Sequence, residues 1–96
     1  MLMYKFSSEP WRYQGKNSWT FISLPLDISE EIRHHLKHEE EGWGRLKANI
    51  KVGASEWKTS IWYDTKLQTY VLPLNAQVRK KEHLMLGTII DVLIWV

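Results

Sequence analysis

The segment from residue 45 to residue 62 constrains the fold of this chain more than any other. Apolar and polar residues alternate from Arg45 to Val52, a pattern typical of a strand with one buried face. Gly53 and Ala54 then suit a two-residue type II′ turn, because glycine takes the positive-φ position at no steric cost. The segment therefore predicts a β-hairpin whose register is set by its turn.

This turn determines which residues face each other in the hairpin. Ile50 is expected opposite Trp57 on the buried face, and Lys51 opposite Glu56 on the outer face. Apolar side chains then meet inside and opposite charges meet outside, so both faces support one register. A turn shifted by one residue would place Val52 at positive φ, which a β-branched residue avoids.

Four further strands are expected around this hairpin. Residues 3–13 resemble one strand interrupted by a proline, which cannot donate to a ladder, and a turn at residues 14–17 joins it to a strand at residues 19–24. A short strand is expected at residues 69–72. The final strand, residues 88–96, carries apolar residues on both of its faces, which predicts burial on both sides.

Two helices are expected between the strands. Asp27 is a favourable N-cap residue, and Ile28, Ile32 and Leu36 follow at a spacing of four, which gives one narrow apolar stripe. We therefore predict a surface helix that packs this stripe onto the sheet. A shorter, basic helix is expected at residues 76–82, before the last strand.

Length and composition limit the class of protein. A chain of 96 residues is long enough for one hydrophobic core, and the absence of cysteine excludes a disulfide framework. No segment has the roughly 20 apolar residues of a membrane helix, and a net charge of +2 does not by itself indicate nucleic acid. We expect residues 1–96 to form a single mainly β domain, soluble and cytoplasmic, without a membrane partner, and either a monomer or a homodimer.

Several motifs resemble one known family. They are Gly42-Trp43, the strand of residues 46–52 with Gly53 after it, Trp57-Lys58-Thr59-Ser60, Tyr70 to Leu74, Val78-Arg79-Lys80 and Leu86-Gly87. In this order they resemble the domain of unknown function family numbered 1905, while the N-terminal hairpin and helix agree only loosely. The resemblance implies a small six-stranded double-split β-barrel, with a surface helix after strand two and a short helix before the last strand. Thr88 departs from the family pattern, in which an aspartate usually follows the glycine.

No segment carries a recognisable constellation of nucleophile, base, metal ligands or phosphate loop, and the resemblance implies no catalytic residue. The first hypothesis is therefore a non-catalytic binding or interaction module for an unknown small molecule or protein, with no cofactor. Its candidate ligand-binding residues are Trp57, Arg79 and Asp91. Asp91 is the one charge in an apolar strand, where a buried carboxylate would need Arg79 or a lysine as its partner.

Two alternatives follow from the charged residues. Arg45, Lys47, Lys51 and Lys58 share the outer face of the predicted hairpin. A fold shared with AbrB-type regulators would make this basic face a phosphate-contacting surface of a nucleic-acid-associated protein. The other, less favoured alternative is a small enzyme centred on Asp91.

Histidines and tryptophans each allow a structural and a functional interpretation. His34 and His38 lie one helical turn apart but opposite the apolar stripe, so we expect them to be exposed and assign no metal. The six tryptophans are expected to fill the core. Their alternative role is a stacking platform for a flat ligand or for bases.

Overall fold

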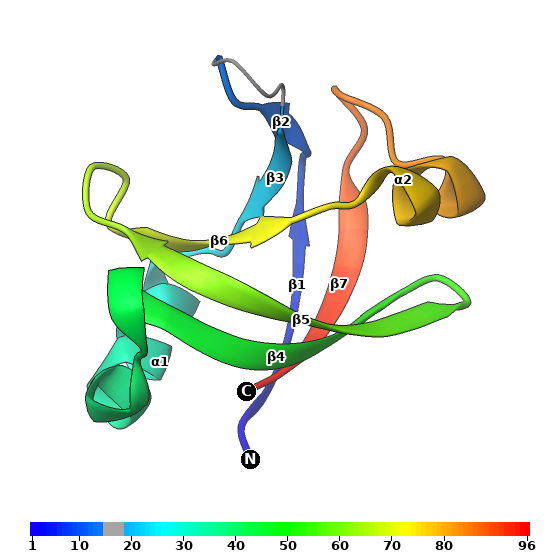
Figure 1. Cartoon of the computed structure of the whole chain (residues 1–96). Coiled ribbons are helices and arrows are strands. Elements are labelled where there is room, and N and C mark those ends of the chain that lie inside the picture. Colours follow the sequence, from blue (N-terminus) through cyan, green and yellow to red (C-terminus); the bar gives the residue numbers. More distant parts are fainter. Residues whose placement is uncertain (15–18) are drawn as a thin grey trace.

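The structure, a computed structural model, describes residues 1–14 and 19–96. The turn predicted at residues 14–17 lies largely outside the described residues. The elements of the described chain are β1 (Met3–Ser8), β2 (Trp11–Arg12), β3 (Thr20–Ser23), α1 (Leu26–Leu36), β4 (Arg45–Val52), β5 (Ser55–Asp64), β6 (Thr69–Pro73), α2 (Ala76–Glu82) and β7 (Ile90–Trp95), with short 3-10 turns at Lys37–Glu39 and Gly42–Gly44 (Figure 1). No helix of the described chain is both long enough and apolar enough to cross a membrane.

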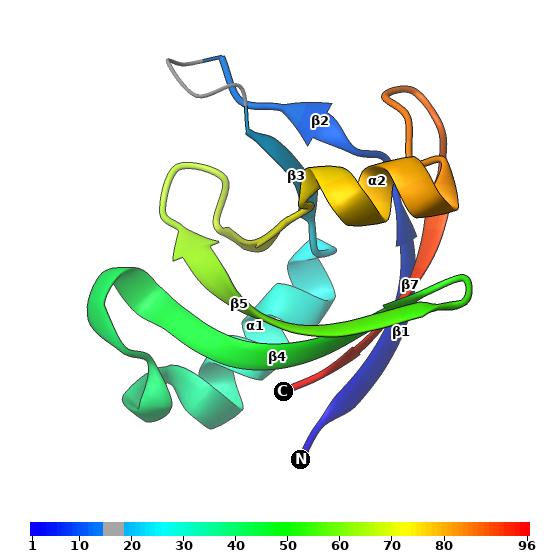
Figure 2. The same ribbon diagram turned by 45° about the vertical axis from the view of Figure 1, so that its right-hand side comes forward.

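The strands form one antiparallel sheet in the order β1-β7-β4-β5-β6-β3-β2. This sheet curls into a half-barrel, and α2 lies across one of its ends (Figure 2). The mainly β fold class is confirmed. The strand predicted at residues 3–13 is divided at Glu9 and Pro10, which accounts for seven observed strands instead of six.

The divided N-terminal strand supplies both edges of the sheet. β1 pairs with β7, whereas β2 pairs with β3. The predicted N-terminal hairpin is therefore correct for β2 and β3 only. The hydroxyl of Ser8 in β1 donates a hydrogen bond of 3.1 Å to the carbonyl of Ser23 in β3. This bond links the edge strand β1 to β3, the neighbour of the other edge strand, where the sheet curls back on itself.

The central hairpin has the predicted register. Ile50 pairs with Trp57 and Lys51 with Glu56. Gly53 has a φ of +58°, the left-handed value that the first position of the turn requires. The alternation in the sequence was sufficient to predict this hairpin because its pairing is local.

The core lies inside the curl of the sheet. Its fully buried side chains include Ile22, Leu24, Ile32, Ile50, Ile61, Tyr70, Leu72 and Ile94. Helix α1 contributes Ile32, and Ile28 and Leu36 pack against the same core while half-buried, which confirms the predicted stripe. The helix begins one residue before Asp27, because the Pro25 carbonyl already accepts a hydrogen bond from the Ser29 amide.

The last strand departs from the prediction on its outer face. β7 is paired on both edges, with β1 and β4, as its apolar composition suggested. Its inner residues Ile90, Val92 and Ile94 are buried, but Trp95 is only half-buried and the preceding Ile89 is 67% exposed. The expectation of burial on both faces is wrong, because no described helix or strand covers the outer side.

Candidate functional site

Asp91 does not occupy the buried position expected for it. Strand alternation places it on the outer face of β7, opposite Ile90 and Val92, and its side chain is exposed. The hydroxyl of Ser7, its neighbour on β1, donates a hydrogen bond to its carboxylate. A carboxylate in contact with water needs no buried cation, so the expected pairing with Arg79 has no physical basis here.

Arg79 lines a cavity of about 380 Å³ beneath α2, which we call the Arg79 cavity. Its lining residues are Trp19, Thr20, Thr59, Pro73, Leu74, Asn75, Ala76 and Arg79. The Nε atom of Arg79 donates a 3.2 Å hydrogen bond to the Leu74 carbonyl, which holds the guanidinium in place. No acidic side chain of the described residues forms an ion pair with it. Its two Nη groups are therefore the donors that this cavity offers to a ligand.

Thr20, another residue of this lining, carries an unusual buried polar group. The residue is only 4% exposed, and its Oγ1 is buried without a hydrogen-bond partner among the described residues. A buried hydroxyl without a partner costs about 1–3 kcal/mol. Sequence analysis did not single out Thr20, because nothing local marks a strand threonine as unpaired.

Five aromatic rings form a cluster on the outer face of the sheet, which we call the aromatic wall. They belong to Trp11, Tyr13, Trp19, Phe21 and Trp62. Phe21 is at the centre, with its ring centroid 5.2 Å from that of Trp11, 5.9 Å from Trp19 and 5.4 Å from Trp62. This cluster is separate from the main core, so the expectation that all tryptophans fill the core is wrong. Tyr13 and Trp19 remain 53% and 46% exposed.

A second cavity, the Arg45 cavity, borders the aromatic wall through Tyr13 and Trp62. Its volume is about 560 Å³, and its lining residues are Tyr13, Arg45, Trp62, Tyr63, Asp64, Thr65 and Lys66. The carboxylate of Asp64 already accepts hydrogen bonds of 2.9 Å from two amides of the following turn. The cavity thus combines aromatic rings with the cations of Arg45 and Lys66.

The three candidate ligand residues do not share one cavity. Trp57 lines a separate cavity of about 430 Å³ between β5 and α2. This cavity adjoins the Arg79 cavity, since Asn75 contributes to both. Asp91 lines neither of them. Trp57 and Arg79 therefore line two adjoining cavities that share Asn75, whereas Asp91 lies on the outer face of β7.

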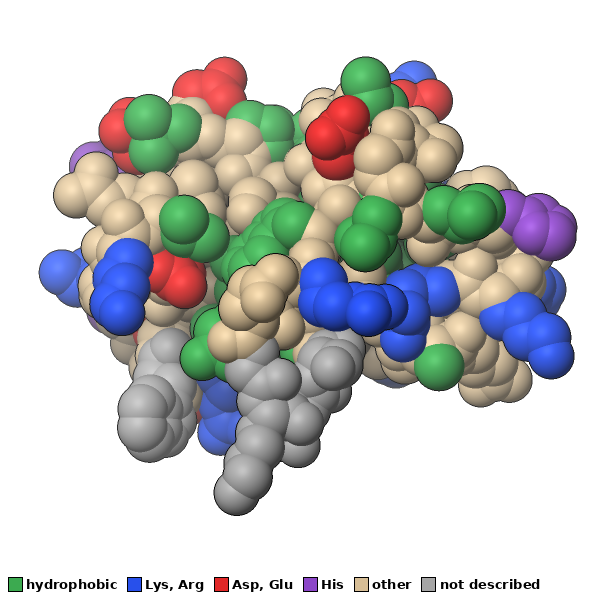
Figure 3. Space-filling view, turned by 90° about the horizontal axis from the view of Figure 1, so that it is seen from above, with side chains coloured by type: hydrophobic (Ala, Val, Ile, Leu, Met, Phe, Trp, Pro, Cys, Tyr) green, Lys and Arg blue, Asp and Glu red, His purple; other side chains and the backbone are tan. Residues whose placement is uncertain are grey.

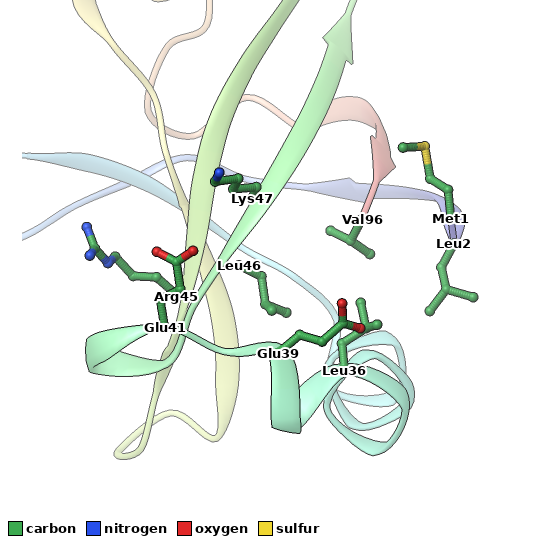
Figure 4. Close-up of a pocket in the computed structure, with 9 residues that line it drawn as sticks. All are labelled: Met1, Leu2, Leu36, Glu39, Glu41, Arg45, Leu46, Lys47 and Val96. Atoms are coloured by element: carbon green, nitrogen blue, oxygen red, sulfur yellow. The ribbon is translucent and has the colours of Figure 1, made fainter.

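The four basic residues of the alternative hypothesis are all exposed on β4 and β5. Arg45 and Lys47 also line a cavity of about 450 Å³ beside the end of α1 (Figure 4). Glu39 and Glu41 line the same cavity. Because both signs of charge meet there, this part of the face is less positive than the lysines and arginine alone would make it.

Figure 3 shows the end of the molecule that carries α2 and the β2–β3 hairpin. Hydrophobic side chains lie at the centre of this end, and Lys and Arg side chains lie beside them. On helix α1, His34 and His38 are exposed as predicted. No group of three metal-ligating side chains occurs in the described part of the chain.

A partly buried hydrogen bond attaches the segment after α1 to the sheet. The hydroxyl of Tyr70, whose ring is fully buried, donates a hydrogen bond to the carboxylate of Glu40. The guanidinium carbon of Arg33 lies 3.6 Å from the ring centre of Tyr63, and that ring meets Tyr70 edge-on at 5.2 Å. Burial, and then the bond to Glu40, raise the pKa of Tyr70 above its usual value.

The raised pKa values of Tyr70 and Tyr4 predict that the protein loses stability at alkaline pH. Burial, reinforced by Glu31, also raises the pKa of Tyr4 to about 12. Because the neutral phenols are favoured in the folded state, their contribution is complete below the ordinary tyrosine pKa of about 10 and is lost as the pH rises through the raised values. Urea unfolding measured at pH 8, 10 and 11 should show this decline, and Tyr70→Phe should reduce it. A free energy of unfolding that stays constant to pH 11 would contradict the expectation.

The fold and its cavities define a small mainly β protein with a curled sheet and surface cavities lined by arginines and aromatic residues. A family profile described as Domain of unknown function (DUF1905) matches residues 6–94, and the chain belongs to this family. The match begins in β1, so it includes the N-terminal hairpin and helix that resembled the family only loosely. A search among curated proteins found no match.

Proposed function

We propose that this protein is a non-catalytic binding module whose ligand carries a flat ring and an anionic group. The observation that carries the proposal is the composition of the Arg79 cavity. Its lining residues include an arginine that has no acidic partner among the described residues and the half-exposed Trp19. The absence of cysteine agrees with a reducing compartment, and the proposal includes a cytoplasmic location.

Each group in the cavity supports one part of this ligand. A guanidinium binds carboxylates and phosphates through two parallel hydrogen bonds, which are stronger than bonds between neutral groups. Trp19 presents a ring that stacks on Phe21 from one side, so its exposed surface suits a flat ligand.

The same lining residues support binding without catalysis. Arg79 is the one charged side chain among the described residues that line the cavity. An arginine stays protonated at physiological pH, so it cannot act as a general acid and base. The hydroxyls of Thr20 and Thr59 have no neighbouring base in this lining that would activate them as nucleophiles.

Isothermal titration with adenosine 5′-monophosphate, adenosine, benzoate and inorganic phosphate tests this function. The two ring-containing anions should bind more tightly than the ring or the phosphate alone. Arg79→Gln should weaken their binding by about tenfold to a hundredfold, because it removes a charged hydrogen-bond donor. Lys80→Gln is the matched control, since it removes a cation from the neighbouring exposed residue of α2. Absence of binding by all four probes, or equal loss in both variants, would refute the proposal.

A second candidate function is association with nucleic acid through the basic face. The supporting observation is that Arg45, Lys47, Lys51 and Lys58 are all exposed on the same two strands. If this face contacts phosphates, Lys47→Glu and Lys51→Glu should weaken binding to all duplex sequences alike and flatten its salt dependence. Gel-shift titrations at about 50 mM salt measure this. No detectable binding at that salt concentration would exclude this function.

A further inference from the structure

The Arg79 cavity and the Arg45 cavity both border the aromatic wall. Trp19 lines the first and Trp62 lines the second, and their ring centroids are 6.2 Å apart with the rings nearly edge-to-face. Each cavity contains one arginine and at least one aromatic ring of the wall. The combination of an arginine and an aromatic ring is therefore present twice, and the Trp19 and Trp62 rings of the two cavities are in contact with each other.

We propose that one ligand occupies both cavities and that it is a chain of two or more nucleotides. This inference rests on the proposed function of the Arg79 cavity. A nucleotide chain repeats a flat ring and an anionic group, which is the same repetition that the two cavities present. Aromatic side chains stack with any base, and arginines beside them bind the phosphates of the strand.

The exposed surfaces of the wall suit this ligand. Tyr13, directly after β2, and Trp19, directly before β3, are the two wall residues with about half of their surface in contact with solvent. Trp19 is supported from behind by Phe21, and Tyr13 meets Phe21 edge-on at 6.4 Å. A base stacked on either ring would meet a platform that is already held by packing, which lowers the entropic cost of binding.

The charges around the second cavity agree with a phosphate. Arg45 and Lys66 are its two cations, and both are exposed. The Nε atom of Arg45 donates to the Gly42 carbonyl at 3.1 Å, which leaves the Nη groups for a ligand. Asp64 is the acidic residue in this lining, and its carboxylate is engaged by backbone amides of its own turn.

The test compares adenosine 5′-monophosphate with single strands of two, four and eight deoxyadenosines, with tryptophan fluorescence as the readout of stacking. Affinity should rise by about tenfold or more from one nucleotide to two, because a second base and phosphate are bound. Arg45→Gln should lower affinity for the dinucleotide to the level of the monophosphate and leave the monophosphate unchanged. Arg79→Gln should weaken both. Lys5→Gln removes an exposed cation from β1, outside both cavities and outside the basic face, and should leave both affinities within about twofold.

The outcomes separate this inference from the proposed function. Binding of the monophosphate with no gain for the dinucleotide would overturn the inference and leave the proposed function standing. No binding of the monophosphate would overturn both. Affinity that stops rising at two nucleotides would identify a free dinucleotide as the ligand, and a continued rise to eight would identify a single strand. If Arg45→Gln has a lowered melting temperature, Lys66→Gln makes the same comparison within the same cavity.

Discussion

Deletion of residues 93–96 should unfold the protein completely. These residues carry the fully buried Ile94 and the part of β7 that pairs with both β1 and β4. Burial of one such side chain contributes about 1.5–3 kcal/mol, and a domain of this size has only about 5–15 kcal/mol of net stability. The lost pairing on two edges adds to this deficit. Circular dichroism during heating should show no cooperative transition for the shortened chain.

Two isoleucines provide the matched control for this deletion. Ile94→Ala creates a cavity in the core and should cost about 2–5 kcal/mol. Ile89→Ala alters the same residue type five positions earlier, where the side chain is 67% exposed, and should change stability by less than about 0.5 kcal/mol. A shortened chain that melts cooperatively near the temperature of the intact protein would show that β7 is peripheral, and the sheet order described above would be wrong.

Replacement of Tyr70 by alanine should be the most damaging single substitution outside β7. Its ring is fully buried, and Tyr63 packs against it edge-on. Loss of a large buried aromatic ring typically costs about 3–5 kcal/mol. The substitution also leaves Glu40 without the hydroxyl that bonds to it. Urea denaturation should therefore show a strongly lowered midpoint with an unchanged slope.

Tyr70→Phe separates the two contributions. It keeps the buried ring and removes only the hydrogen bond to a charged group, so it should cost about 1.5–3 kcal/mol. Tyr13→Phe removes a hydroxyl from a residue that is 53% exposed and should have little effect. Equal stability of Tyr70→Phe and the unchanged protein would mean that the contact with Glu40 contributes nothing to folding.

The parts of the fold that were predicted correctly depend on local patterns. The register of the central hairpin follows from one turn, and the buried stripe of α1 follows from a spacing of four residues. The prediction that Asp91 is buried was wrong, because alternation identifies the two faces of a strand but does not show whether a second layer covers each face. That information depends on distant parts of the chain, which leave the outer side of β7 open.

The candidate site was only partly visible in the sequence. Arg79 and Trp57 were identified as candidates. Thr20 was not, because it is brought near Arg79 by the pairing of β3 with β6 and by the turn into α2, and no local pattern predicts that pairing. A usable signal was present for the aromatic wall. Trp11 and Tyr13, and then Trp19 and Phe21, are spaced two residues apart on neighbouring strands, so strand periodicity places each pair on one face.

The position of β7 in the sheet also affects how the chain assembles during synthesis. Among the strands of this sheet, β7 leaves the ribosome after all the others, yet it lies between β1 and β4, which are made much earlier. Until it emerges, both of these strands have an unpaired edge that can join to another nascent chain. Contacts between such distant segments also form slowly, because a long loop must close first. The nascent protein is therefore most prone to aggregation before β7 has emerged, when a chaperone that covers strand edges would protect it.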